Sequence, residues 1–255
     1  MTRDIVNTYT WTLDAIVIWL RYFFLAGLGY FLFYILWKKQ GYFQKIQKKK
    51  PATKTIHREI RYSIFTLCIY CLTSLLTFTL VRHGFTRIYL DITEFGYPYF
   101  FASIALMVLL HDAYFYWTHR LMHLPFLFRK VHLLHHRSHN PTPWTAFAFH
   151  PFEAIISVGI IPILIFLIPC HPYALSLFLT FMTLVNVLGH LGYELFPFGF
   201  RKSKLGKWQN TASNHDLHHR NSKHNFGLYF TIWDRIMKTH REPNNHIIQE
   251  VMNEA

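Results

Sequence analysis

The sequence predicts an all-α integral membrane protein with about four transmembrane helices, the last two forming a hairpin, and a histidine-rich helical cap on one side. The first observation is composition: 52% of the 255 residues are hydrophobic, 18% are aromatic, and the mean hydropathy is +0.16. Ordinary soluble domains are less apolar and less aromatic. The second is a set of long apolar runs, and the third is an uneven distribution of Lys, Arg and His between them.

Four apolar stretches approach or reach the roughly 20 helical residues needed to cross a hydrocarbon core of about 30 Å. They are Leu13–Trp37, Ser63–Val81, Tyr99–Trp117 and the long run Ala154–Tyr193. Pro169 and the segment "CHPYA" divide the last run, which predicts a hairpin. The first stretch is not preceded by a basic region or followed by a small-residue cleavage site, so we expect a retained helix and not a cleaved signal peptide.

Arg21 interrupts the first of these spans. A charge within the membrane indicates function by default. Near one end of a span, however, a long basic side chain more often extends to the headgroups while its apolar stem stays in the hydrocarbon. We therefore interpret Arg21 as a residue that reaches the membrane surface.

Basic residues are concentrated in alternate loops. Three segments are rich in Lys and Arg: 38–61, which carries nine of them, 120–137 and 201–241. In the second loop, by contrast, Arg82 and Arg87 stand nearly alone. The positive-inside rule therefore places the basic segments on the cytosolic side, and the N-terminus, the second loop and the tip at 170–173 outside. A net charge of +13 distributed in this way favours contact with anionic headgroups and not with nucleic acid.

Eighteen histidines are present, and three short clusters hold eight of them. The clusters are His119 with His123, then His132, His135 and His136, and finally His215, His218 and His219. Residues three or four apart on a helix share a face, so each cluster can aim two or three nitrogens at one point. The orientation derived from Lys and Arg alone places all three clusters on the inner side, where they can meet. Grouped neutral imidazoles near a membrane also need partners, which favours shared metal binding.

Eight nitrogens exceed what one metal ion takes. A structural zinc ion uses four protein ligands, and a catalytic zinc ion uses three plus water. The count therefore predicts a di-metal site in the cytosolic cap. Imidazole suits zinc, copper, iron and nickel alike, so the residues alone do not name the metal.

Further polar residues lie near the same level of the chain. The segment "NVLGHLGYE" places Asn186, His190 and Glu194 along one helical face, with His190 as a candidate ninth ligand. Glu194 either binds metal or orients His190. Asp112 shares a stripe with the first histidine pair, which indicates a buried orienting carboxylate. His150 in "FHPFE" is a second-tier candidate, and it can be a ligand, a partner of a ligand or a helix-start residue.

The order of these motifs resembles one family. "HRLMH", "HLLHH" and "HDLHH", followed by "NFGLYFTIWDRIMKT", are similar to the pattern of the fatty acid hydroxylase/sterol desaturase superfamily of integral-membrane, non-haem di-iron oxidoreductases. The aromatic, Trp and Asp-Arg residues that close this pattern correspond to Phe226, Tyr229, Phe230, Trp233, Asp234 and Arg235. "NPTPWTAFAFHPFEAI" looks like the matching segment of sterol desaturases, and "HLGYE" looks more like that of sterol methyl oxidases. The resemblance covers roughly Tyr99 to His240.

The resemblance implies two iron ions held by the histidines of all three boxes, with His190 at a further family position. The implied ligands are His119, His123, His132, His135, His136, His190, His215, His218 and His219. It also implies O2 as co-substrate and oxidation of an unactivated C–H bond to an alcohol or an alkene. At the position of His190, fatty acid 2-hydroxylases have the motif H-x-x-x-H. In this sequence Glu194 stands where that motif has its second histidine, so the ligand count and the substrate stay open.

The resemblance further implies a division of the chain. We expect two transmembrane helices with a basic loop over 1–98, a catalytic domain over 99–241 and a flexible tail over 242–255. No cytochrome b5-like segment and no G-x-G-x-x-G motif is found in the sequence, so we expect electrons from a separate cytochrome b5-, ferredoxin- or reductase-like donor. The resemblance implies a lipid substrate, which can be sterol-like, fatty acyl, alkylglycerol, sphingolipid or carotenoid. We expect the membrane to be the endoplasmic reticulum or a bacterial inner membrane.

Two alternatives use the same histidines. A membrane zinc hydrolase would need an open three-ligand site with a general base, for example H-E-x-x-H, and this motif does not occur. A metal carrier would need polar residues at mid-membrane and repeat symmetry. Metal analysis separates the three, because two irons per chain favour the oxygenase, one zinc the hydrolase and loosely bound metal the carrier.

Overall fold

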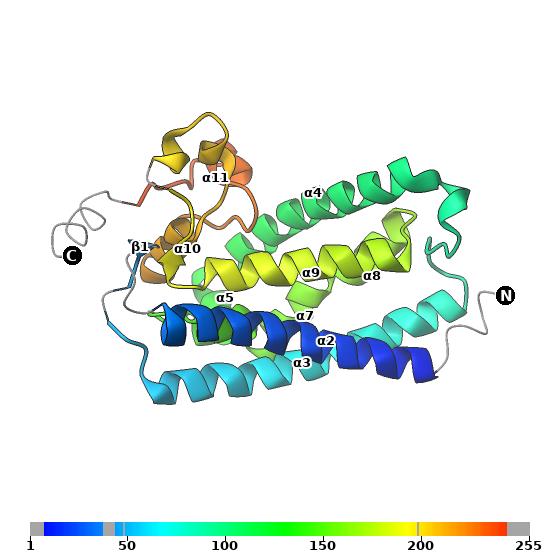
Figure 1. Ribbon diagram of the computed structural model, residues 1–255, viewed down its shortest axis with the longest axis horizontal. Helices are drawn as coiled ribbons and strands as arrows, with labels where there is room; N and C mark the ends of the chain where they lie inside the picture. Colours follow the sequence, from blue (N-terminus) through cyan, green and yellow to red (C-terminus); the bar gives the residue numbers. More distant parts are fainter. Residues whose placement is uncertain (1–7, 38–43, 48, 198, 244–255) are drawn as a thin grey trace.

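The computed structural model describes residues 8–37, 44–47, 49–197 and 199–243. Long helices lie side by side along one axis, and a smaller cap covers one end of them (Figure 1). The helices of membrane-spanning length and hydropathy are α2 (Thr8–Tyr30) with its continuation η1 (Phe31–Leu36), α3 (Thr53–Arg82), α4 (Gly96–Met122) and α9 (Pro172–Gly189). The predicted all-α, multi-pass membrane fold is confirmed.

The predicted hairpin is present, with an interrupted first arm. This arm consists of α7 (Pro151–Val158) and α8 (Ile160–Leu167), and α9 is the second arm. The break falls at Gly159, where an added Cβ would lie 3.0 Å from the hydroxyl oxygen of Tyr114. Tyr114 donates a hydrogen bond to the carbonyl oxygen of Ile156 at 2.6 Å, so α4 is held closely against this arm.

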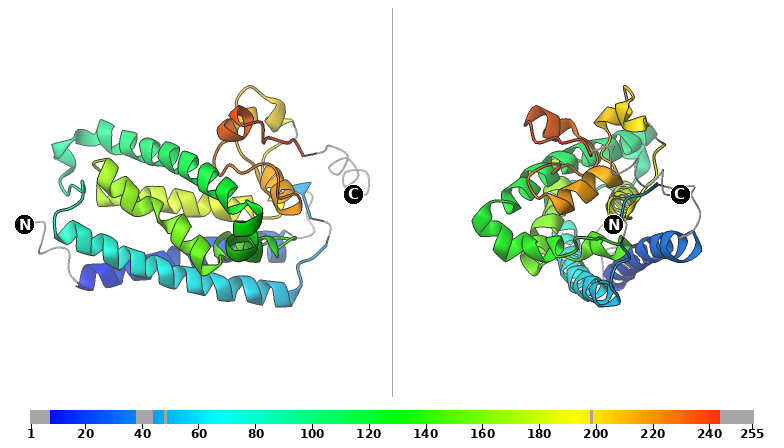
Figure 2. Two further views of the ribbon diagram at one scale, coloured as in Figure 1. Left: turned by 180° about the vertical axis from the view of Figure 1, so that it is seen from behind. Right: turned by 90° about the vertical axis from the view of Figure 1, so that its left-hand side faces the viewer.

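The two ends of the bundle match the alternation of the loops. At one end the loop after α3, with the short helix η2 (Ile92–Glu94), pairs with the hairpin tip through a bridge between Ile88 and Cys170. The start of α2 lies at the same end, and the cap lies at the other (Figure 2). Segments that the positive-inside rule assigned to one side therefore share one end.

The cap consists of short elements from three parts of the chain. β1 (Gln44–Lys45) pairs antiparallel with β2 (Tyr193–Glu194). Its helices are α5 (Pro125–Leu127), η3 (Phe128–His132), α6 (Leu133–His136), η4 (Pro143–Phe147), η5 (Phe200–Lys202), η6 (Gly206–Trp208), α10 (Ala212–Arg220) and α11 (Ile232–Ile236). The flexible tail predicted over 242–255 lies outside the described residues from 244 onward, as do 38–43 and 48 of the basic loop.

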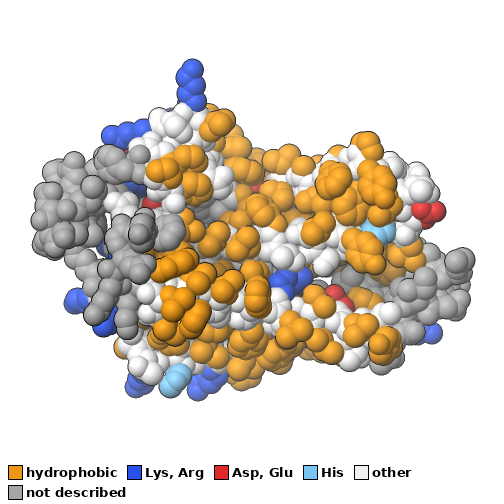
Figure 3. Space-filling view, in the orientation of Figure 1, with side chains coloured by type: hydrophobic (Ala, Val, Ile, Leu, Met, Phe, Trp, Pro, Cys, Tyr) orange, Lys and Arg blue, Asp and Glu red, His pale blue; other side chains and the backbone are white. Residues whose placement is uncertain are grey.

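The outer surface of the helices is apolar. Leu20, Phe24, Leu72 and Phe101 are each more than 60% exposed, which water would disfavour and hydrocarbon accommodates. Figure 3 shows hydrophobic side chains along the helices and blue Lys and Arg side chains mainly over the cap. This distribution is typical of a bundle that stands in a bilayer with its cap in the headgroup region.

Candidate metal centre

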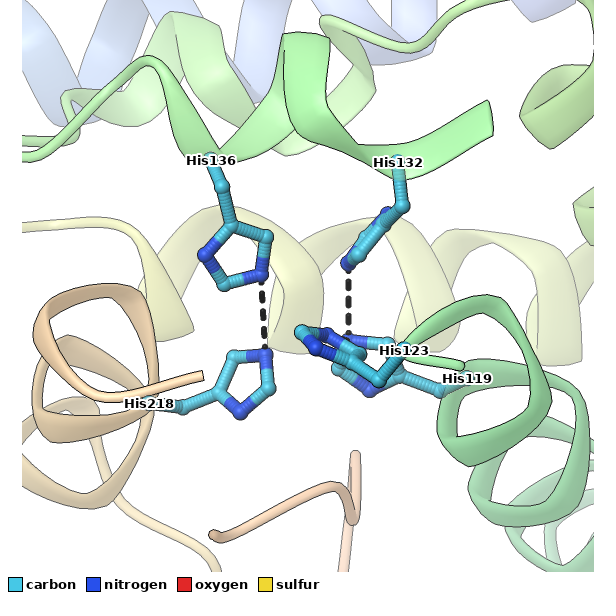
Figure 4. Close-up of side chains that lie close together, drawn as sticks. All are labelled: His119, His123, His132, His136 and His218. Carbon is cyan, nitrogen blue, oxygen red and sulfur yellow. Dashed lines mark hydrogen bonds between the residues drawn. The ribbon is translucent and has the colours of Figure 1, made fainter. Parts of the chain in front are cut away.

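All nine histidines predicted as ligands come together at the cap end of the bundle. They form two groups, in each of which one nitrogen per residue lies within 4.8 Å of the others. The first group is His119, His123, His132, His136 and His218, and the second group is His135, His190, His215 and His219. Figure 4 shows the first group, whose rings point toward one another from the end of α4 and from η3, α6 and α10.

The groups cut across the sequence motifs. His132 and His136 belong to the first group, while His135, between them, belongs to the second. In "HDLHH" the outer pair, His215 and His219, again shares one group and the remaining histidine joins the other. Residues four apart lie close to one line on a helix, whereas a neighbouring residue is turned by about 100°. Each cluster therefore aims two nitrogens at one point, within the two or three that were expected, and the third histidine of each triplet joins the other group.

The Nε2 atoms within each group lie at the spacing of metal ligands. The distance from His119 to His132 is 3.0 Å, and the distance from His136 to His218 is 3.1 Å (Figure 4). In the second group His190 lies 3.2 Å from His135, measured between Nε2 atoms. A metal–imidazole bond of about 2.1 Å places ligands 90° apart about 3.0 Å from each other, and tetrahedral ligands about 3.4 Å apart.

Acceptors on the far side of the rings orient the imidazoles. Nδ1 of His119 lies 2.8 Å from the carbonyl oxygen of Phe226. His190 and His218 make the same contact at 2.7 Å, with the carbonyl oxygens of Asn186 and His224. A carbonyl oxygen only accepts, so each Nδ1 carries the proton and each Nε2 presents a lone pair. Adjacent Nε2 lone pairs about 3 Å apart repel, and a cation between them removes the repulsion.

Glu153 is a partner of the centre that the sequence analysis missed. Its Oε1 lies 2.7 Å from Nδ1 of His132, and both side chains are 2% exposed. The available signal was its place in "FHPFE", as the last charged residue before the apolar run. His150, the candidate chosen from that motif, caps α7 through its Nδ1, which accepts from the Phe152 amide at 3.4 Å. His150 belongs to neither group.

Burial keeps these imidazoles neutral. It lowers the pKa of His190 to about 4. Burial first, and neighbouring imidazoles second, hold the pKa of further members well below the usual value: His132, His135, His215, His218 and His219. Both ring nitrogens of His219 are buried without a hydrogen-bond partner among the described residues. A neutral, buried and unpartnered nitrogen is suited to a metal ion.

The carboxylates of Asp112 and Glu194 contact backbone amides. Asp112 accepts hydrogen bonds from the amides of Tyr229 at 3.1 Å and Phe230 at 3.2 Å. Glu194 accepts one from the amide of Ser213 at 3.2 Å, at the start of α10. Neither carboxylate belongs to a histidine group. The Asp112 contacts attach the C-terminal part of the cap to α4, and the Glu194 contact joins β2 to α10 within the cap.

Glu59 fixes the loop after the second histidine box. Its two carboxylate oxygens accept hydrogen bonds at 2.7 Å from the hydroxyls of Ser138 and Thr142. One turn along α3, the hydroxyl of Ser63 donates a hydrogen bond to the carbonyl oxygen of Trp144. The hydroxyl of Tyr22 in α2 donates to the same oxygen. The two N-terminal helices therefore position the loop that follows His136.

An apolar cavity leads to the histidines. It has a volume of about 310 Å³ and lies between α2, α3, α4 and the hairpin. A smaller cavity next to it is lined by members of both groups, including His119, His132, His135, His190 and His215. His111, Phe115 and Phe149 line both cavities. A lipid-sized molecule in the larger cavity can therefore present one of its carbons to the histidine groups.

Membrane-length helices that end in two buried imidazole groups define a multi-pass membrane protein with a candidate di-metal centre. Comparison with known proteins agrees with this class. The family model described as "Fatty acid hydroxylase" matches residues 104–239, more than half of the chain. No solved structure matches the chain.

Characterised relatives cover most of the chain. A Delta(7)-sterol 5(6)-desaturase of Gibberella zeae is 28% identical over 224 residues, which span 86% of this chain and 68% of the relative. The lathosterol oxidase of Homo sapiens is 29% identical over 231 residues, and that of Rattus norvegicus is 30% identical over 233 residues. Both alignments span 89% of this chain and 73% of the relative. The chain belongs to the fatty acid hydroxylase/sterol desaturase superfamily, and it is a membrane oxidoreductase.

Proposed function

We propose that the chain is an O2-dependent oxidoreductase with two non-haem iron ions, which hydroxylates or desaturates a C–H bond of a sterol-like or other lipid. The observation that carries the proposal is the pair of buried imidazole groups beside an apolar cavity. The names of the relatives, sterol desaturases and lathosterol oxidases, support a lipid substrate.

The donor set fits iron. The nine histidines would hold two ions through neutral nitrogens, five in the first group and four in the second. A catalytic zinc ion takes three protein ligands and a water, so groups of this size argue against the zinc hydrolase. Their position at the ends of the spanning helices, as for His119 in the last turn of α4, argues against a carrier with a site at mid-membrane. When bound, iron would supply the redox chemistry with O2 that removes hydrogen from an unactivated C–H bond.

The protein side chains would position the substrate and exclude water. Phe115 and Phe149, which line both cavities, would hold the apolar body of the lipid where the larger cavity meets the histidines. The tight packing there would keep bulk water from the reacting carbon. Glu153 would hold the ring of His132 in place. We assign positioning roles to Asp112 and Glu194, which would keep the C-terminal histidines in register with those of α4.

The arrangement also suggests roles for the parts of the chain. Residues 99–241 would form the catalytic portion, and the helices of 1–98 would complete the cavity wall. With the basic end facing the cytosol, Arg129, Lys130 and Arg137 would be exposed there near the second histidine box. These cations would attract an acidic electron donor. The membrane would be the endoplasmic reticulum or a bacterial inner membrane.

Metal content and product analysis test the proposal. The chain purified in detergent should bind two irons, and cells that express it should accumulate a lipid changed by one oxygen or by two hydrogens. His135→Ala and His218→Ala each remove one ligand from a different group, and each should abolish the product. His83→Ala, an exposed histidine at the opposite end of the bundle, should change neither iron nor product. One zinc per chain, or full turnover in both ligand variants, would contradict the proposal.

A further inference from the structure

A polar cluster lies within the apolar cavity. Asp14 and Arg21 of α2 line it together with Ser74 of α3, which contacts Asp14 directly. The Ser74 hydroxyl donates a hydrogen bond to Asp14, and an attractive electrostatic interaction links Asp14 with Arg21. The remaining lining is mostly aliphatic and aromatic. In Figure 3 basic and acidic side chains interrupt the hydrophobic face of the bundle near its middle.

The position of Arg21 corrects its interpretation as a residue at the membrane surface. The apolar helix begins at Tyr9 and runs to Leu36, so Arg21 lies near its middle. At 1.5 Å per residue it stands roughly 18 Å from the first end and about 22 Å from the second, farther than a side chain extends. Its side chain lines the cavity between the helices. A charge at this depth is costly, and function is the usual reason for its retention.

The guanidinium of Arg21 retains free hydrogen-bonding capacity. Within the described ranges, the ion pairs closer than 4.0 Å are His132–Glu153 and Arg220–Asp216, so Arg21 and Asp14 do not form a direct pair. A guanidinium offers five N–H donors, and a carboxylate bonded to one serine keeps lone pairs to accept with. The cluster can therefore both donate to and accept from a group placed between its members.

The charges of the cluster select the kind of group. Arg21 and Asp14 together are neutral, so a carboxylate or phosphate would be repelled by Asp14 and an amine by Arg21. A hydroxyl group is neutral, accepts from a guanidinium and donates to a carboxylate. We propose that Asp14, Arg21 and Ser74 bind the hydroxyl group of a lipid alcohol whose apolar body fills the cavity. This inference rests on the proposed function, since it assigns the substrate class for the same site.

The geometry also places the hydroxyl relative to the centre. Gly29 of α2 packs against Val187 and Leu191, which flank the histidine His190 of the second group along the chain. Gly29 follows Arg21 by eight residues, or about 12 Å of helix. Asp14 precedes Gly29 by fifteen residues, or about 22 Å of helix, so the cluster holds the hydroxyl roughly 12 to 22 Å along the bundle axis from the histidines. The carbon that reacts belongs to a part of the lipid remote from this hydroxyl group.

Ligand binding tests the inference independently of turnover. The full-length, iron-loaded chain in lipid nanodiscs is titrated with two alcohols, lathosterol and 1-octadecanol, and with their analogues that lack the hydroxyl group. At least one alcohol should bind tenfold or more tightly than its deoxy analogue. Arg21→Leu and Asp14→Asn should lose this preference, while binding of the deoxy analogue and iron content stay unchanged. Arg21→Lys keeps the positive charge but offers fewer hydrogen-bond donors, so this variant should retain part of the preference for the alcohol.

Matched controls separate recognition from folding. Thr79→Val removes an exposed hydroxyl from α3, and Arg82→Leu removes an exposed cation from the end of α3, and both should keep the preference. Arg21→Leu should fold, because it removes a charge from the middle of a spanning helix. An equal preference for alcohols in Arg21→Leu and the unaltered chain, or no preference in either, would overturn the inference. An Arg21-dependent preference in a chain without O2-dependent turnover would overturn the proposed function and leave the inference standing.

Discussion

The hydrogen bond between Glu153 and His132 gives a quantitative prediction for the centre. Its length is 2.7 Å, and both side chains are 2% exposed, so water does not replace a lost partner. The Glu153 carboxylate fixes the orientation of the His132 ring and raises the basicity of its Nε2 atom. Glu153→Ala removes this acceptor. Loss of such a partner lowers metal affinity about 10- to 100-fold, which equals about 1.4 to 2.7 kcal/mol. Glu153→Gln keeps an oxygen acceptor without the charge, and we expect a smaller loss.

The assay is release of iron to a chelator, because the two groups should then separate. His132 belongs to the first group, so Glu153→Ala should lose one iron of two at a chelator concentration that removes none from the unaltered chain. The iron of the second group should stay bound. His150→Ala is the matched control, since His150 lies three residues away at the start of α7 and in neither group. Equal retention of both irons in Glu153→Ala, or parallel loss of both, would refute the reasoning.

Three further predictions concern ligands, the cap and pH. His190→Ala should release metal from the second group and leave the first loaded, which iron stoichiometry and the spectrum of the remaining ion would show. Asp112→Asn weakens two hydrogen bonds to the C-terminal segment and should lower the free energy of local opening of this segment by about 1 to 3 kcal/mol. Hydrogen exchange at the amides of Tyr229 and Phe230 measures this change, and unchanged exchange there would contradict the prediction. The metal-free chain should lose thermal stability as the pH falls from about 6.5, the usual histidine pKa, toward about 4, the pKa of buried His190. In this range the unfolded chain binds more protons than the folded chain, so acid favours unfolding, and a midpoint independent of pH would contradict this account.

The spanning helices and the nine histidines could be predicted because each depends on local pattern. Hydropathy over about 20 residues identifies a span without knowledge of its neighbours. The four-residue spacing of pairs such as His119 and His123 places both on one helical face wherever the helix lies. The distribution of Lys and Arg predicted the membrane side of each loop. It therefore predicted that His215 and His132 lie at the same end of the bundle, although more than 80 residues separate them in the sequence.

What could not be predicted depends on tertiary contact. The acceptors that orient the rings are largely backbone carbonyls, as at Phe226 and Asn186, and any residue type carries one. Glu153 is recognisable as a partner only once α7 lies beside η3. The place of Arg21 depended on where the first helix begins, since a start at Tyr9 and not Leu13 moves this residue from near one end toward the middle. The division of the histidines into two groups depends on how five elements, α4, η3, α6, α9 and α10, are rotated relative to one another.

The candidate metal centre is formed by residues of both the membrane bundle and the cap. The first group combines α4 of the bundle with η3, α6 and α10 of the cap, and the second joins the end of α9 to α6 and α10. α10 has nine residues, too few to be stable alone, and its buried face consists largely of polar side chains such as His215, Asp216 and His218. Apolar burial therefore contributes little to holding it. Metal binding at both groups would supply that stability, so assembly of the cap would be coupled to metal loading. The metal centre would then form only at the mouth of a cavity that the helices already provide.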